Sequence, residues 1–85
     1  MTQEQKSQST PVNLRKRAGL TQRQVARALD IRESTVSEWE RGLSVPRLPL
    51  RKVSLMMQVY RCSLDELIEA FESNQLAAVS PNVEN

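Results

Sequence analysis

The residues best suited to chemistry form a row of short polar side chains between Glu33 and Arg41. If this segment is a helix, Val36 and Trp39 lie three residues apart on one face, and hydrogen-bonding side chains occupy the other face. The polar row consists of Glu33, Ser34, Thr35, Ser37, Glu38 and Arg41. A helix that is buried on one side and polar on the other can present donors and acceptors to base edges in the major groove of DNA. The pattern therefore predicts a DNA-reading helix.

Catalytic and metal-binding sites have few candidate residues. The chain has no histidine and one cysteine, Cys62, so it has no internal disulfide and no ordinary set of zinc ligands. A glycine-rich phosphate loop and a nucleophile–histidine pair are also missing from the sequence. We expect no enzymatic activity, no metal and no cofactor. For Cys62, core packing is the favoured interpretation and a redox switch is the alternative.

Length and composition favour a single small all-α domain. The chain has 85 residues, of which 39% are hydrophobic and 26% charged, and it contains only two glycines. No run of alternating apolar and polar residues indicates a strand. No apolar stretch approaches the roughly 20 residues that span a bilayer, and the N-terminus has no signal-peptide pattern. We expect a cytoplasmic, nucleoid-associated protein without a membrane partner.

The net charge is only +2, but the charges are unevenly distributed along the sequence. Residues 12–52 contain ten basic and four acidic residues, a balance of +6, whereas residues 53–85 contain one basic and five acidic residues, a balance of −4. This asymmetry suits a protein that docks on phosphates with one side. Two oppositely charged solvated faces with no such role are the alternative.

Two short helices joined by a tight turn must position the polar row. Val25, Ala26 and Leu29 share one face of a helix predicted over residues 22–29, which begins at a capping box formed by Thr21 and Gln24. Residues 30–32 form the turn, and Ile31 fills it. The second helix is predicted over residues 33–41 and is closed by Gly42. We interpret residues 22–41 as a helix-turn-helix motif.

Three further helices complete the predicted domain. The first runs over residues 11–18, from Thr10 and Pro11 to a left-handed cap at Gly19. After an extended loop over residues 43–49, helices are predicted over 50–60 and from Ser63 to about residue 73, and Ser63 and Glu66 form a second capping box. The predicted core comprises Leu14, Val25, Ala26, Leu29, Ile31, Val36, Trp39, Val53, Met56, Met57, Tyr60, Leu64, Leu67, Ile68 and Phe71.

Both ends of the chain are predicted to lie outside this domain. Residues 1–9 are polar and form a predicted disordered arm, residues 10–73 form the domain, and residues 74–85 form a flexible tail. Residues 76–79 are an apolar patch in that tail. They either extend the last helix or contact a partner.

The order of LRKRAGLTQRQVARAL, TVSEWERG, a proline-containing loop and CSLDELIEAF closely resembles the phage-repressor and Cro-like helix-turn-helix regulators. This family is also named after the xenobiotic response element (XRE). The resemblance covers about residues 12–71. It implies a compact five-helix, lambda-repressor-like DNA-binding domain with its helix-turn-helix in the second and third helices.

The resemblance also implies roles for individual residues. Gln22 contacts a DNA phosphate and braces the recognition helix, and Arg15 forms a structural pair with Glu40. Base edges are read by Glu33, Ser34 and Thr35, with Ser37 and Glu38 at positions that touch bases or phosphate in some members. The loop holds the backbone through Arg41, Ser44 and Arg47, and we add the neighbouring arginines Arg23 and Arg32 to the phosphate contacts.

Some of these residues have simpler explanations. An acid at the first helical position is favoured by the helix dipole, so Glu33 need not read a base. Glu38 has the spacing to pair with Arg41. Trp39 is interpreted as core rather than as a stacking platform. The sequence departs from the family at Asp30, where members most often have glycine, although aspartate can also adopt the left-handed conformation that this turn position implies. It also departs in the loop and early fourth helix, residues 44–55, which are slightly longer than is usual in the family.

Together these features predict a sequence-specific transcriptional regulator of double-stranded DNA, with repression as the default. One recognition helix contacts few base pairs, so we expect a homodimer on a palindromic operator, held by the fifth helix and the apolar tail. The first alternative is an antitoxin-like or other partner-binding module in which DNA binding is secondary. The second is a nonspecific nucleic-acid-binding accessory protein.

Overall fold

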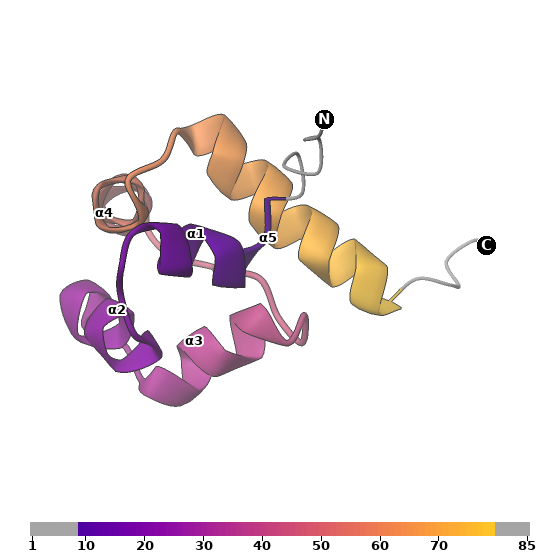
Figure 1. Ribbon diagram of the computed structural model, residues 1–85, viewed down its shortest axis with the longest axis horizontal. Coiled ribbons are helices and arrows are strands. Elements are labelled where there is room, and N and C mark those ends of the chain that lie inside the picture. Colours follow the sequence, from indigo (N-terminus) through magenta and orange to yellow (C-terminus); the bar gives the residue numbers. More distant parts are fainter. Residues whose placement is uncertain (1–8, 80–85) are drawn as a thin grey trace.

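Five helices and no strand make up the described part of the chain, residues 9–79, with side chains described for residues 9–72. The computed structural model contains α1 (Pro11–Arg17), α2 (Gln22–Leu29), α3 (Glu33–Glu40), α4 (Leu50–Tyr60) and α5 (Leu64–Val79). In Figure 1, α2 and α3 lie on one side of α1, and α5 lies on the other. The expectation of an all-α fold is confirmed. The predicted arm falls almost entirely outside the described residues, as does the tail from residue 80.

Local capping signals define most helix ends. The Thr10 hydroxyl accepts a hydrogen bond from the backbone of Asn13, and Pro11 occupies the start of α1. Both capping boxes are formed. In the first, the Thr21 hydroxyl accepts from the Gln24 backbone N–H, and the Gln24 side chain accepts from the Thr21 backbone N–H. Ser63 and Glu66 make the same two bonds in the second. Gly19 and Gly42 have φ angles of +74° and +76°. These left-handed positions end α1 and α3 within one residue of the predicted ends.

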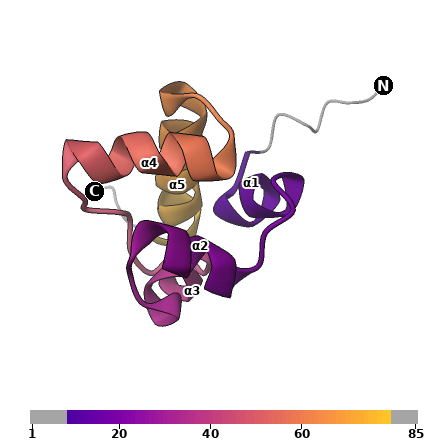
Figure 2. The same ribbon diagram turned by 90° about the vertical axis from the view of Figure 1, so that its left-hand side faces the viewer.

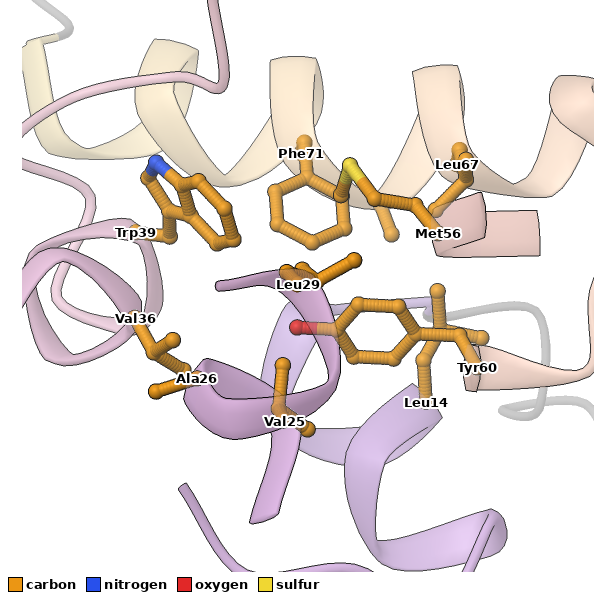
Figure 3. Packing of buried hydrophobic residues seen from close by; sticks show 11 residues of the cluster. Leu14, Val25, Ala26, Leu29, Val36, Trp39, Met56, Tyr60, Leu67 and Phe71 are labelled. Atoms are coloured by element: carbon orange, nitrogen blue, oxygen red, sulfur yellow. The ribbon is translucent and has the colours of Figure 1, made fainter. Parts of the chain in front are cut away.

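The core lies where all five helices meet. Its fully buried members are Leu14, Val25, Ala26, Leu29, Val36, Trp39, Met56, Tyr60, Leu67, Ala70 and Phe71. Phe71 is the centre of an aromatic cluster, since Trp39 and Tyr60 each lie edge-on to it with ring centroids 5.7 Å apart (Figure 3). This geometry is a favourable arrangement of ring quadrupoles. It joins α3, α4 and α5 across the domain.

The core prediction is wrong at two positions on α5. Leu64 and Ile68 are 46% and 45% exposed, because α5 turns Leu67, Ala70 and Phe71 toward the other helices instead. Ile31, Val53 and Met57 are only partly buried and pack against the core from its edge. Ala70, which was not predicted, is fully buried.

The fifth helix is longer than the sequence pattern indicated. It continues to Val79, although the apolar periodicity is lost after residue 73. Residues 74–79 are Asn, Gln, Leu, Ala, Ala and Val, mostly good helix formers, and the sequence meets a helix breaker only at Pro81. The first of the two alternatives for residues 76–79, an extended helix, is therefore correct for their backbone. Their side chains lie outside the described residues.

A buried hydroxyl lies within this core. Tyr60 is fully buried, and its hydroxyl is the one buried side-chain polar atom without a hydrogen-bond partner in the described part of the chain. Burial raises the pKa of this phenol, so the group stays protonated and neutral. A buried, unpaired hydroxyl is destabilising because it has lost its hydrogen bonds to water.

We therefore expect Tyr60→Phe to raise the free energy of unfolding by about 1 kcal/mol, as judged from the cost of an unpaired buried group. The phenylalanine ring keeps the edge-on contact with Phe71. Urea unfolding followed by circular dichroism measures the change. A less stable variant would show that the hydroxyl contributes an interaction that its surroundings do not reveal.

Candidate nucleic-acid interface

The turn between α2 and α3 fixes the angle at which the two helices cross. Asp30 adopts the left-handed conformation at the end of α2, with φ 58° and ψ 49°. Its backbone N–H donates to the Arg27 carbonyl, and the Ile31 N–H donates to the Ala26 carbonyl. A short polar side chain tolerates this backbone region better than most residues, although glycine would tolerate it without strain. Figure 2 shows α2 and α3 together at one end of the molecule, below α4 and α5.

The third helix separates buried and exposed residues as the sequence predicted. Val36 and Trp39 are buried. Of the polar row, Glu33, Ser34, Glu38 and Arg41 are exposed, and Thr35 and Ser37 are half-buried at its flanks. Glu38 and Arg41 form no ion pair in the described part of the chain, so the simpler explanation of Glu38 does not apply. Both side chains are open to an external partner.

The N-terminus of α3 is accessible as well. Its capping position is Arg32, an exposed residue whose side chain makes no capping hydrogen bond. Glu33 follows as the first-turn acid. The first backbone N–H groups of α3 therefore lack the side-chain oxygen that caps α1 and α2, and the helix dipole at this end is complemented by Glu33.

A polar network braces the helix pair from behind. Arg15 donates from Nε to Glu40 Oε2 at 2.5 Å and from Nη2 to Glu40 Oε1 at 3.1 Å, which forms the expected pair. The Arg15 Nη1 donates to the Leu20 carbonyl at 3.0 Å. Gln22 Nε2 also donates to Glu40 Oε1, at 2.8 Å. The hydrogen bond with Glu40 raises the pKa of Arg15 above its usual value.

The comparisons with known proteins bear on this arrangement directly. A family model described as helix-turn-helix, the XRE family, matches residues 13–67, more than half of the chain. The chain belongs to the XRE family of helix-turn-helix regulators. This family has the all-α lambda-repressor-like fold and is a family of DNA-binding regulators rather than of enzymes. No curated protein and no solved structure matches the chain.

In this XRE-family domain, the candidate phosphate-binding side chains differ in solvent exposure and in the contacts that they already make. Arg23, Arg32, Arg41 and Arg47 are exposed. Ser44 is half-buried and lies with Arg47 in a hollow that is also lined by Thr35 and Trp39, so the loop lies beside α3. The half-buried Gln22 is held by Glu40.

The hydrogen bond between Gln22 and Glu40, residues 18 positions apart, is a bracing contact of the kind that the family resemblance implied for Gln22, although the sequence did not identify its partner. A second polar contact was not predicted at all. The Lys52 Nζ donates to the Leu29 carbonyl at 2.7 Å. A cation at the last carbonyl of a helix is favoured by the helix dipole. Lys52 thereby ties α4 to the end of α2, next to the turn.

A metal site, a redox switch at Cys62 and a membrane-spanning helix have little support in the described part of the chain. No group of three or more His, Cys, Asp or Glu residues there is placed to hold a metal ion. Cys62 is half-buried against the core, and burial raises the pKa of its thiol, with a further contribution from Glu66. A raised thiol pKa lowers the thiolate fraction, which favours packing over a redox switch. Among the described helices, none has the length and apolarity that crossing a membrane requires.

Proposed function

We propose that this chain is a sequence-specific transcriptional regulator, a repressor by default, which binds a palindromic operator in double-stranded DNA as a homodimer. The observation that carries the proposal is the outer face of α3, which is polar and open on a helix braced by Arg15, Gln22 and Glu40. A rigid helix with free donors and acceptors meets the geometric requirement for reading base edges.

We assign base reading and phosphate contacts to separate groups of residues. Glu33, Ser34, Thr35, Ser37 and Glu38 read bases, while Gln22, Arg23, Arg32, Arg41, Ser44 and Arg47 position the protein on the backbone. Phosphate contacts carry no sequence information themselves, whereas the few base contacts set the choice of site. Such a protein acts at the nucleoid, and occupancy of a promoter by so small a domain represses by excluding polymerase.

We assign the homodimer interface to α5 and the groove beside it. The groove is lined by apolar residues of the loop, α4 and α5, among them Val45, Val53, Met56 and Phe71, with Leu64 and Ile68 at its exposed edge. Single exposed apolar residues are common on protein surfaces and need no explanation, but neighbouring ones that continue an apolar groove favour a contact with another protein. The same groove would serve a toxin-like partner, so a chain that stays monomeric on DNA would favour the antitoxin-like alternative.

Selection of bound duplexes from a random pool at physiological salt tests the proposal. We expect the wild type to enrich a palindromic motif. Glu33→Ala should relax the preference at one position of each half-site, since a base contact is worth about 1–3 kcal/mol of discrimination. The matched control is Glu69→Ala, which removes the same side chain from an exposed residue that does not line the groove and should leave the base preferences within each half-site unchanged.

Enrichment of no motif by the wild type would overturn the sequence-specific function. Uniform affinity for all duplexes would favour the nonspecific accessory protein. A palindrome that is unchanged by Glu33→Ala would keep the regulator and reduce Glu33 to its role at the helix dipole.

A further inference from the structure

One carboxylate near the end of α3 holds side chains from both preceding helices. Glu40 Oε1 accepts from Gln22 of α2 and from Arg15 of α1, and Glu40 Oε2 accepts a second bond from Arg15. The Glu40 side chain is only 5% exposed and that of Arg15 only 14%. A charge-assisted, forked contact of this kind has one strongly preferred geometry. The carboxylate is therefore fixed in place before any ligand arrives.

Gln22 is consequently fixed from two directions. Its backbone follows Thr21, which is locked by the capping box with Gln24, and its side-chain amide is held by Glu40. An amide nitrogen carries two N–H donors, and the bond to Glu40 uses one of them. The second donor remains for another acceptor, in an orientation that Glu40 sets.

We propose that Glu40 is a positioning residue for DNA binding, which holds the Gln22 amide so that its second N–H donates to a DNA phosphate. The inference rests on the proposed function, in which Gln22 contacts the backbone. Holding a flexible side chain in its bound conformation removes part of the ordering cost of association. Arg15 contributes by fixing Glu40, so the grip on the phosphate depends on a residue of α1.

Equilibrium binding to the selected operator tests the proposal through a double-mutant cycle. We expect Glu40→Gln to weaken binding about tenfold, because one neutral amide oxygen holds Gln22 and Arg15 less firmly than the carboxylate does. We expect Gln22→Met to do the same, because it removes the donor to the phosphate. The double variant should bind as each single variant does, because Glu40 acts through Gln22. Glu66→Gln is the control, since it is the same substitution at another partner of an α1 arginine, Arg17. It should bind like the wild type.

The salt dependence distinguishes positioning from electrostatics. Gln22 is neutral and releases no counterion, so the tenfold ratio should be the same at 50 and 200 mM salt. Thermal unfolding of each variant ensures that only folded protein is compared. If Glu40→Gln does not fold, Arg15→Lys replaces it in the cycle, since lysine keeps the charge but loses the fork that orients Glu40.

Additive losses in the cycle, or an unchanged affinity of the folded Glu40 or Arg15 variant, would overturn the positioning role and leave the proposed function standing. Failure of the wild type to bind any duplex would overturn both.

Discussion

Trp39→Ala is expected to lower the free energy of unfolding by about 3–5 kcal/mol, the range for removing a large buried aromatic side chain. Trp39 is 3% exposed and lies edge-on to Phe71, so alanine leaves a cavity between α3 and α5 and removes an aromatic contact. A small domain has only about 5–15 kcal/mol of stability in total. The variant should therefore be largely unfolded at temperatures where the wild type is folded.

Urea unfolding followed by helical circular dichroism measures this loss. Trp39→Phe is the matched control and should lose much less, because a ring remains against Phe71. The result bears on function as well, since Trp39 is the inner anchor of the helix whose outer face we assign to base reading. A Trp39→Ala variant that kept nearly full stability but lost DNA binding would contradict the core assignment and restore the stacking interpretation.

The sequence predicted most accurately what is decided locally. The ends of α2 and α4 and both capping boxes match the structure, because caps depend on residues within one turn of each other. The left-handed Asp30 was also expected, since the turn requires that conformation whichever residue occupies it. A second left-handed residue, Arg61, ends α4 and has no signal of its own in the sequence.

The errors on α5 have a common physical cause. Apolar periodicity shows which face of a helix avoids water, but not how much of that face another element covers. The stripe through Leu64, Leu67, Ile68 and Phe71 is wider than the surface available to it, so α5 buries the side that includes Ala70 and leaves Leu64 and Ile68 half exposed. Ala70 escaped prediction because a small residue contributes little to an apolar stripe.

Polar contacts between distant residues were harder to foresee. The pair of Arg15 and Glu40 was expected only because the chain resembles a family in which it is common. No periodicity connects Gln22 with Glu40 or Lys52 with Leu29. Such contacts depend on the angle between helices, which packing decides after the local structure has formed.

The second large effect is expected when the exposed apolar side chains on α5 are replaced by polar ones. In the double variant Leu64→Gln/Ile68→Gln, two half-exposed apolar side chains become polar, while the helix propensity and the net charge are retained. We expect the folded domain to persist. Its affinity for a palindromic duplex should fall about 10²-fold or more, toward that for a single half-site, because the two subunits no longer bind as one unit.

The comparison of whole palindrome and half-site makes this prediction specific to dimerisation. Titration of both duplexes, with sedimentation equilibrium of the free protein, gives the affinity and the oligomeric state together. Leu50→Gln is the control, since Leu50 is 86% exposed on α4 and does not line the groove. A double variant that bound the half-site more weakly too would indicate damage to the reading unit, and one that kept full affinity for the palindrome would place the dimer contact elsewhere.

Because the groove meets the loop that follows α3, a subunit docked there would set the distance between the two recognition helices, and with it the spacing of the half-sites.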